Sequence, residues 1–513
     1  MKNGKIEIPD QDGGILTIPD PEDIPQYIET NRNIFSAWSF NIGGIDAKSF
    51  REIARGEASE LSNKYTANFS PKPHIIDKDT IVIETGHQPG LSHPGIIAKY
   101  LLMNNLINKN NYAGLNLIVD SDNFQDISLY IPNREKSTIP LLSLNKPIPF
   151  ETAEEIDADR VNQFLDDIDE SLSPPYLNTV RNNFVQWKKE VKNNPSQSSN
   201  LTTLLTHLRR IFTRGKLGEL PISLQSEGTT FLTFFLHIVQ DAERFTQIYN
   251  SQLSLYRKVN KVRDKAHPFP NLKIDNCIEL PFWHITGDER RRIAVKIDRE
   301  KIYLKSNGQE LAVIAADNIG RGIEILREKG LKIRPNGLTT TMFNRMFIAN
   351  LFVHGIGGAK YDLATDAVIR EFFAAEPPLY ATITMTKYPD VTVGDKSERI
   401  KLLEDKLRNI EYNPDRYVDN KNPLVTDKKR LLLEITKQHA DKKSIGKRIS
   451  AINQALLSIL KEEIKDDRIE LDKLKEEMEI NSYIRRRDYP YFFFKAAKLN
   501  ELIVNNIQSG RTK

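Results

Sequence analysis

Apolar and polar positions in the first third of the chain alternate between a strand period and a helix period. Thr80–Glu84 is a β-branched run that predicts a strand, and Ile96–Ile107 has the spacing of a helix. Leu115–Asp120 predicts a second strand, and polar, turn-rich sequence follows it to about residue 200. Because strands that alternate with helices are typical of a parallel sheet covered by helices, we predict an α/β fold.

Residues 265–330 have a different pattern. Four short strand-like runs precede a helix near Asn318–Lys329, and this order predicts a small α/β insertion. After it, Met342–Phe352 has a helical pattern with Leu351–Gly355 as its apolar tail, and another helix begins near Asp362. The parallel-sheet core is therefore expected to resume beyond the insertion.

From Ser397 onward the chain is highly charged, with apolar positions at heptad spacing. Ile400, Leu403 and Leu407 follow a 3-4 spacing of this kind. Prolines interrupt the pattern, so we predict an antiparallel helical hairpin or a short coiled coil used for dimerisation. Amphipathic helices lying on the main body are the alternative. The aromatic run Tyr489–Phe494 is predicted to be buried against the core.

These patterns divide the chain into a core, an insertion and a helical part. The expected parts are 1–264, the first part of a Rossmann-like core with helical insertions; 265–330, the small α/β insertion; 331–395, the second part of the core; 396–480, a helical coiled-coil hairpin; and 481–513, the C-terminal return to the core.

Composition excludes several classes of function. The 513 residues include 73 basic and 69 acidic side chains, and a net charge of +4 is too small to favour nucleic-acid or membrane binding. Cys277 is the single cysteine, which excludes an intrachain disulfide and a cysteine zinc cluster. Apolar runs stay below the ~20 residues of a membrane helix. No apolar segment follows the charged start Met1–Lys5, so we expect no signal peptide and a cytoplasmic protein.

The loop between the first predicted strand and its helix is the richest candidate site. Three glycines, two prolines, two histidines and a glutamine lie between Thr85 and Gly95. This order offers backbone N–H groups to an anion at a helix N-terminus, although a tight turn also uses glycine. The histidines can hydrogen-bond a phosphate or carboxylate, or move a proton. The expected ligand-binding residues are Thr85, Gly86, Gln88, Gly90, His93 and Gly95, with His87 as a catalytic candidate.

Acidic residues follow the second predicted strand. The candidates here are Asp120, Asp122, Asn123 and Asp126. In parallel sheets ligands bind beside the carboxyl ends of strands, where carboxylates can hold an ammonium group, coordinate Mg²⁺ or act as a base. Asp122 is therefore a second catalytic candidate. An Asx-rich turn that caps the next element is the alternative.

A second glycine-rich segment lies near residue 355. Its candidate ligand-binding residues are His354, Gly355, Gly357, Gly358 and Lys360. Closely spaced glycines let a backbone approach a ligand, and a lysine beside them can meet a phosphate. The hydroxyls of Arg334–Thr341 are expected to cap a helix instead. Two charge clusters, Glu289–Arg292 and Arg485–Arg487, can reach an anionic substrate only if they fold over the cleft.

With these segments the chain resembles, over nearly its whole length, the bacillithiol-biosynthesis cysteine-adding enzyme family. Thr85 to Leu91 matches a family loop of the type Thr-Gly-Gln-Gln-x-Gly-Leu, with His87 in place of the first glutamine. Asp120 to Ile127 loosely matches an acidic family segment, with Asp122-Asn123 where the family has His-Asp. Arg334-Pro335 followed by Gly357-Gly358 resembles a third pattern, in which alanine replaces a proline.

The resemblance implies a ligase that joins cysteine or another amino acid to an amine of a sugar-type acceptor. It implies ATP or ADP with Mg²⁺, no tightly bound metal, small-molecule substrates and a homodimer through the coiled coil. His87 or Asp122 would accept the proton of the attacking amine. An adenylyl- or nucleotidyl-transferring enzyme is one alternative, since His93-Pro94-Gly95-Ile96 is similar to the His-x-Gly-His signature of such proteins. A non-catalytic coiled-coil scaffold with a degenerate core is another.

Overall fold

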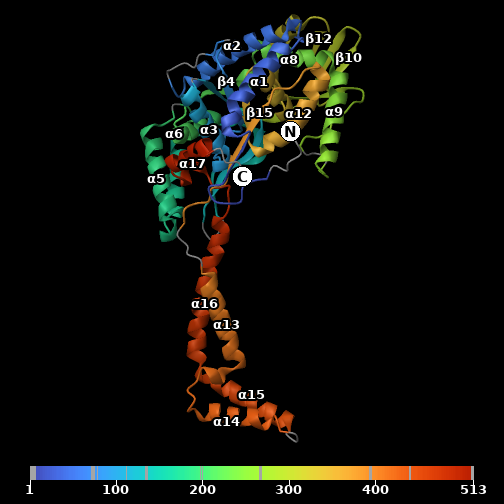
Figure 1. Cartoon of the computed structure of the whole chain (residues 1–513). Helices are drawn as coiled ribbons and strands as arrows, with labels where there is room; N and C mark the ends of the chain where they lie inside the picture. The colour runs from blue at the N-terminus through green and yellow to red at the C-terminus, as the bar shows by residue number, and fades with distance from the viewer. Residues whose placement is uncertain are drawn as a thin grey trace.

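We describe the chain from a computed structural model, which places residues 7–70, 76–77, 79–110, 112–132, 137–196, 198, 200–264, 268–391, 396–437 and 441–509. It has a large α/β body from which a long helical arm projects (Figure 1). The predicted α/β fold is therefore confirmed at the level of its class.

A six-stranded sheet forms the centre of the body. Its strands stand in the order β1-β15-β14-β4-β5-β8, and all neighbours are parallel except β1 with β15. The strands are β1 (Ile15–Ile18), β4 (Val82–His87), β5 (Ala113–Ile118), β8 (Gly218–Pro221), β14 (Leu351–His354) and β15 (Tyr380–Met385). Thus the predicted mostly parallel sheet is present.

Two predictions near the glycine segments are corrected. The strand predicted to end at Glu84 continues to His87, so that Thr85 and Gly86 pair with β5 as part of β4. Leu351–His354 is not the tail of a helix but the central strand β14. It is only four residues long and buried on both faces, so its apolar run has no period that distinguishes a strand from a buried helix.

The connections that leave β4 and β14 cross the sheet in opposite directions. From β4 the chain passes through α3 (Pro94–Asn110) to β5, and from β14 it passes through α12 (Ile356–Phe373) to β15. Since both crossovers join parallel strands but leave in opposite directions, right-handed connections place the two helices on opposite faces of the sheet. The boundary between β4 and β14 is therefore a topological switch point.

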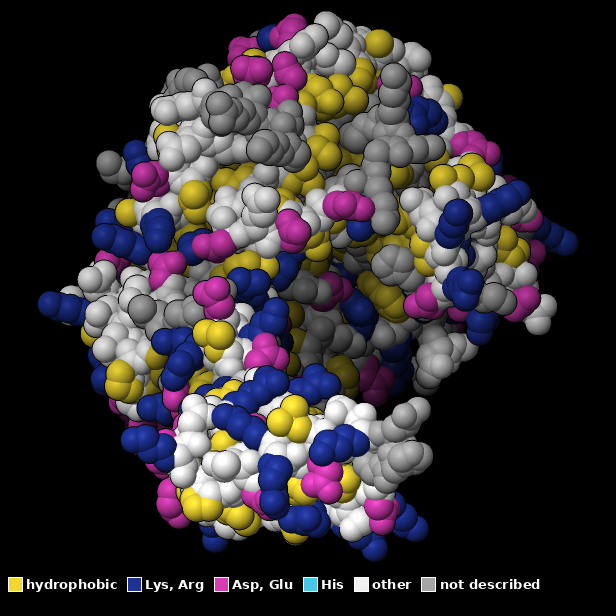
Figure 2. All heavy atoms as spheres, turned by 60° about the horizontal axis from the view of Figure 1, so that its bottom comes forward, with side chains coloured by type: hydrophobic (Ala, Val, Ile, Leu, Met, Phe, Trp, Pro, Cys, Tyr) yellow, Lys and Arg dark blue, Asp and Glu magenta, His cyan; other side chains and the backbone are white. Residues whose placement is uncertain are grey.

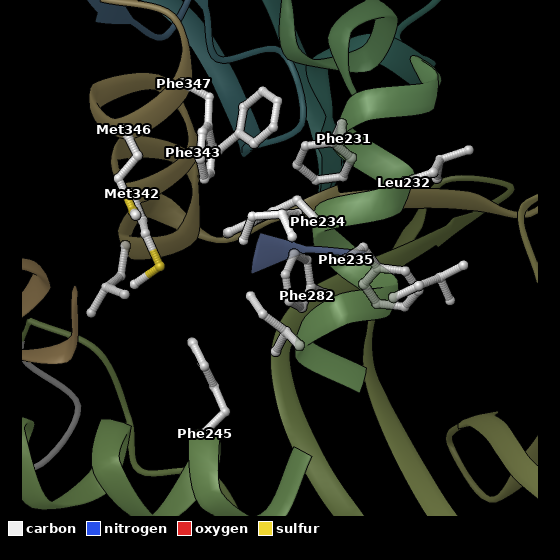
Figure 3. Packing of buried hydrophobic residues seen from close by; sticks show 14 of the residues in the cluster. Phe231, Leu232, Phe234, Phe235, Phe245, Phe282, Met342, Phe343, Met346 and Phe347 are labelled. Carbon is white, nitrogen blue, oxygen red and sulfur yellow. The ribbon is translucent and has the colours of Figure 1, made fainter. Parts of the chain in front are cut away.

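Two hydrophobic clusters enclose the sheet. One face packs against α2 (Ala47–Thr66), α8 (Thr229–Gln240), α11 (Gly337–Phe347) and α12. Several phenylalanines contact one another in this cluster, and Figure 3 shows Phe231 and Phe234 of α8 directed towards Phe343 of α11. The opposite face packs against α3, and burial on both sides explains the apolar starts of the central strands β4 and β14.

The predicted insertion is a second sheet. Four antiparallel strands and a helix follow one another, and a fifth strand comes from sequence after the expected boundary at residue 330. The elements are β9 (Ile278–Thr286), β10 (Glu289–Asp298), β11 (Lys301–Ser306), β12 (Gln309–Ala315), α10 (Ile319–Glu328) and β13 (Lys332–Pro335).

The stretch up to residue 200 that was expected to be polar and turn-rich is structured. It contains β6 (Asn123–Tyr130), β7 (Thr138–Pro149), α4 (Ala158–Ser171) and α5 (Asn178–Asn193). The signal was present at helical spacing, because Phe164, Leu165 and Ile168 of α4 are all buried. The many turn residues between these elements concealed it.

Other helices complete the body. Asp46 begins α2 as its N-cap, since its Oδ1 accepts hydrogen bonds from the backbone of Lys48 and Ser49 at 3.2 and 3.1 Å. The remaining elements are α1 (Ile24–Ala37), β2 (Asn41–Ile42), β3 (Ile45–Asp46), α6 (Leu201–Thr213), α7 (Ile222–Gln225), α9 (Ala242–Val259) and α17 (Ala496–Ser509).

The arm is an antiparallel pair of helices with two further helices at its far end (Figure 1). Ion pairs join α13 to α16, including Arg399–Glu470 at 2.9 Å and Lys475–Glu404 at 2.7 Å. The arm consists of α13 (Ser397–Tyr412), α14 (Pro423–Glu434), α15 (Lys442–Ile459) and α16 (Lys461–Ile484). Figure 2 looks along it and shows Lys and Arg side chains gathered over its end. The helical hairpin is present, and its use in dimerisation remains a prediction.

After the arm the chain returns to the body. The aromatic run is buried, and Phe492 stacks on Trp187 of α5 with ring centroids 4.3 Å apart. α17 then packs along α3. In the described part of the chain, no helix has both the length and the apolar character needed to cross a bilayer.

Candidate functional site

A cleft of about 670 Å³ opens at the carboxyl ends of β4 and β14, at the switch point. Three stretches that are far apart in the sequence line it: the loop after β4, the segment after β5, and the glycine segment after β14. The predicted site residues that line this cleft are Gly86, His87, Gln88, His93, Gly95, Asp122, His354, Gly355, Gly357, Gly358 and Lys360.

Five predicted residues lie outside the cleft lining. Thr85 is buried in the sheet, where its hydroxyl donates to the carbonyl of Val353 at 2.7 Å. Asp120 is also buried and accepts a hydrogen bond from the backbone of Ser223 at 2.9 Å. Gly90, Asn123 and Asp126 line an adjoining hollow of about 320 Å³, on the other side of the histidine loop.

The surroundings of Asp120 indicate a role in structure, although this residue follows the end of a strand. Burial, followed by the nearby carboxylate of Glu151, raises the pKa of Asp120 to about 7. Hydrogen bonds from Ser223 and the charge of Arg334 act in the opposite direction. Arg334 itself is held by Glu151 at 2.8 Å, so these groups join the second half of the chain to the first beneath the cleft.

The two loop histidines are neutral hydrogen-bonding groups. Burial, aided by the charge of Lys99, lowers the pKa of His87 to about 3. Burial and the charges of Arg487 and Lys99 lower the pKa of His93 to about 4. The Nδ1 atom of His93 accepts the backbone N–H of Gly95 at 3.1 Å, so its Nε2 carries the proton and is a donor.

Lys99 is the functional residue that we did not predict. It lies on α3, is only 2 % exposed, and donates from Nζ to the carbonyl of Gly86 at 2.7 Å. Burial and the charge of Arg209 lower the pKa of Lys99 to about 7. The sequence did contain a signal, because Lys99 is a lone charge within the apolar run Ile96–Met103. A lysine kept in such a place needs a reason beyond solubility.

The second charge cluster folds over the cleft. Arg487 lines it from the segment that follows the arm, and its Nη2 donates to Thr384 Oγ1 at 3.1 Å and to the Met385 carbonyl at 3.0 Å. Burial lowers the pKa of Arg487, although this group keeps its charge at neutral pH. Lys99, Arg487 and Lys360 therefore make the cleft cationic.

Asp122 is held by the first charge cluster. Its Oδ1 lies 2.5 Å from Nη1 of Arg290, and its Oδ2 accepts a hydrogen bond from Gln88 at 2.6 Å. Arg290 in turn lies over the ring of Trp283, with its guanidinium carbon 4.6 Å from the centroid. Both carboxylate oxygens are thus engaged, which makes Asp122 a clamp between the insertion and the loop and weakens its case as a base.

A buried ionic cluster supports the other half of the cleft. Nε2 of His354 lies 2.7 Å from Oδ2 of Asp362, which is fully buried on α12. Asp362 also accepts hydrogen bonds from Thr341 at 2.6 Å and Arg345 at 2.8 Å. Burial raises the pKa of Asp362, but the contact with His354, the charge of Arg345 and the hydrogen bond from Thr341 outweigh it and hold the pKa well below its usual range.

Glycines give ligand access from the side of α12. Ideal Cβ atoms added at Gly355 or Gly357 would meet no atom within 4 Å, so the backbone there faces open space. The N-cap of α12 is Gly355, whose side-chain-free position leaves the first N–H groups of the helix uncapped. The helix near Arg334–Thr341 is capped, but by the amide oxygen of Asn336, which accepts from Thr339 N at 3.0 Å, and not by a hydroxyl as predicted.

The cleft lining has more basic than acidic side chains, a balance that suits an anion. Among the described residues no three His, Cys, Asp or Glu side chains gather as a metal site would require. The chain matches no protein-family model and no curated protein. Its function must therefore be inferred from the cleft.

Proposed function

We propose that the protein is a carbon–nitrogen ligase that binds an anionic, nucleotide-activated substrate at the switch point. The observation that supports this most is the convergence of Lys99, Arg487 and two helix N-termini on one cleft. Partial positive charge at the N-termini, the full charge of Arg487 and the protonated fraction of Lys99, whose pKa is about 7, attract phosphate or carboxylate groups. Asp122, the acidic side chain of the lining, is neutralised by Arg290.

The site divides binding between its two halves. His93 donates from Nε2, and Lys99 has two further N–H groups beyond the one given to Gly86. The open backbone at Gly355 and Gly357 leaves room for a phosphate chain above α12. ATP or ADP fits this Rossmann-like arrangement, and Mg²⁺ would be held by the phosphates of the nucleotide.

The resemblance to the cysteine-adding enzyme family indicates the classes of the two substrates. It leads us to propose cysteine or another amino acid as the carboxyl partner and an amino sugar as the amine partner. The departures at His87, Asp122 and Gly358-Ala359 all lie in or beside the cleft, so the amino acid or the sugar is where this protein would differ from that family.

Thermal unfolding with added ligands tests the binding step. ATP or ADP with Mg²⁺ should raise the melting temperature with the logarithm of its concentration above Kd, because a ligand at 100 times its Kd adds about 2.7 kcal/mol to the free energy of unfolding. Inorganic phosphate should give a smaller rise, and adenosine none. The absence of any rise with these anions would exclude the ligase and favour the coiled-coil scaffold.

Product analysis then separates ligation from nucleotidyl transfer. With ATP, cysteine and an amino sugar, a ligase should release a nucleotide product only when both partners are present, together with a new amide of matching mass. Release of pyrophosphate without amide formation would favour the nucleotidyl-transferring alternative.

A further inference from the structure

His354 and Asp362 form a contact of a kind found where an imidazole accepts a proton. His354 lies at the carboxyl end of β14 and lines the cleft, and its Nε2 is 2.7 Å from Oδ2 of Asp362. The two groups are not aligned as a hydrogen bond, but at this separation a carboxylate favours a proton on Nε2, and Nδ1 is then the basic nitrogen. A carboxylate in this position also stabilises the imidazolium that forms when Nδ1 takes a proton.

Asp362 is fixed in the orientation that this role requires. Thr341 and Thr365 donate to its Oδ1 at 2.6 and 2.8 Å, and Arg345 donates to Oδ2 at 2.8 Å. Arg345 is fixed in turn by Asp366 at 2.6 Å. The carboxylate therefore has little freedom to turn away from His354.

The free nitrogen of His354 points to the glycine segment of the cleft. A Cβ added at Gly358 would lie 2.6 Å from its Nδ1, so only glycine leaves the imidazole in this position. In the two loop histidines, by contrast, Nδ1 already contacts a backbone group. Nδ1 of His87 contacts the carbonyl of Gln88 at 3.0 Å, and Nδ1 of His93 is occupied by the N–H of Gly95.

We propose that His354 is the catalytic proton acceptor of the cleft and that Asp362 is its positioning residue. This inference rests on the proposed ligase function. As the amine nitrogen attacks the carbonyl carbon of the activated substrate, the C–N bond forms and the bond to the phosphate oxygen breaks. The phosphate leaves with the bonding electron pair, and the proton of the amine passes to Nδ1 of His354.

Charged groups around His354 determine the pH range in which its imidazole is neutral. They are Asp362 of α12, Arg345 of α11, Lys99 of α3 and the phenol of Tyr380 on β15. Burial, with help from Arg345 and Lys99, lowers the pKa of His354 below its usual value, and Asp362 opposes the shift. The imidazole is therefore neutral at pH 7 and able to accept a proton.

Replacing the imidazole tests the proposal. In His354→Gln, kcat should fall by about 100- to 10,000-fold, the range that a general base contributes, while the nucleotide-induced rise in melting temperature remains. The parent kcat should decline as the pH falls through the lowered pKa of His354, and the variant should lose this limb. His237→Gln, a half-buried histidine of α8 with ring contacts to Phe373, is the matched control and should keep the parent kcat.

Asp362→Asn leaves buried Arg345 with less negative charge, so it changes more than the contact with His354. A milder change is therefore needed to test the role of Asp362. Thr341→Val removes one hydrogen bond to Asp362 and should lower kcat several-fold without moving KM. A variant His354→Gln that folds, binds nucleotide and turns over at the parent rate would overturn the proposal.

A readout without turnover separates this proposal from the ligase function. Long-range ¹⁵N–¹H spectra, with the His354 signals among the nine histidines assigned from His354→Gln, should show Nε2 protonated and Nδ1 bare. Thr341→Val should shift these signals. Nδ1 protonated at pH 7 would overturn the proposed pair of His354 and Asp362 even if the ligase were active. The expected tautomer without any nucleotide binding would exclude the ligase. The pair would then remain as a base for another substrate.

Discussion

The two halves of the cleft use the same order of elements in different ways. In both, a central parallel strand leads through glycine into a helix, β4 to α3 and β14 to α12. In the first half, Gly95 is enclosed, because an added Cβ would lie 2.9 Å from the Met385 carbonyl and from Nη2 of Arg487. In the second half, Gly355 and Gly357 face open space.

This difference separates two tasks that an anion site must perform. The first half supplies charge, since Lys99 and Arg487 reach the cleft there, and the enclosed glycine lets these side chains approach the backbone. The second half supplies space, uncapped N–H groups and the His354–Asp362 contact. Substitutions in the first half should therefore change charge and packing, and those in the second should change access.

The largest effect is expected from Lys99→Met, which removes the buried charge. Loss of a charged hydrogen bond to the bound anion should weaken ATP or ADP binding by about 10- to 100-fold at pH 7. Isothermal titration calorimetry measures this change. Lys428→Met is a matched control, since Lys428 is also buried but lies in the arm beside Asp415. Equal loss of affinity in both variants would contradict the role of Lys99.

Lys99→Met should also change how stability depends on pH. The pKa of Lys99 is about 7 in the folded state, against about 10.4 in the unfolded chain. Between these values the unfolded chain binds a proton that the folded chain does not, so the free energy of unfolding rises with pH by up to about 1.4 kcal/mol per unit. Urea unfolding from pH 7 to 10 should show a smaller slope in the variant than in the parent.

Packing around the enclosed glycine gives the next largest effect. Gly95→Ala should lower the free energy of unfolding by about 1–3 kcal/mol, because its methyl group meets a backbone carbonyl that cannot move aside easily. Gly355→Ala has open space and a φ of −81°, so it should change stability by less than about 0.5 kcal/mol. Similar losses in both variants, measured by urea unfolding, would show that the two halves are packed alike.

The sequence predicted the first half of the fold better than the second for a physical reason. The strand before His87 is a β-branched run that ends at glycine, and its helix begins at Pro94, so pattern and punctuation agree. Leu351–His354 follows α11, which is buried along its whole length, and an apolar strand after an apolar helix shows no change of period. Only the parallel pairing with β4 and β15 identifies it as a strand.

The sequence could predict which segments form the candidate site, but not which residues contact one another there. Closely spaced glycines and histidines mark two of the stretches that line the cleft, and acidic residues at a strand end mark the third. Partnerships across the chain are invisible in one sequence: Arg290 reaches Asp122 from the insertion, and Arg487 arrives from beyond the arm. Asp362 lies within α12, where a charge at helical spacing usually faces solvent.

A smaller effect on stability is expected at Gly357, with a separate effect on binding. Gly357→Ala places a methyl group in open space on the first turn of α12, so it should raise the free energy of unfolding by up to about 1 kcal/mol. The same methyl group should weaken nucleotide binding about tenfold, because it occupies the room above the uncapped N–H groups. Gain of stability with loss of affinity is the expected combination, read from urea unfolding and calorimetry.

Gly358→Ala is the neighbouring control for this prediction. Its methyl group would meet Nδ1 of His354 at 2.6 Å, so it should lower stability instead of raising it. If both alanines stabilise the protein and neither weakens binding, the second half does not supply access.

The smallest effect on turnover is expected from Asp122→Asn, which decides between a base and a clamp. The amide keeps the shape of the carboxylate and can still accept from Arg290, and the pair is partly exposed, with side chains 20 % and 35 % accessible. Stability should therefore fall by less than about 1 kcal/mol, and kcat by less than about tenfold. A base would behave differently, because an amide cannot take a proton and kcat would drop by about 100-fold or more. Such a drop, with His354→Gln near the parent rate, would move the proton acceptor from the second half of the cleft to the first.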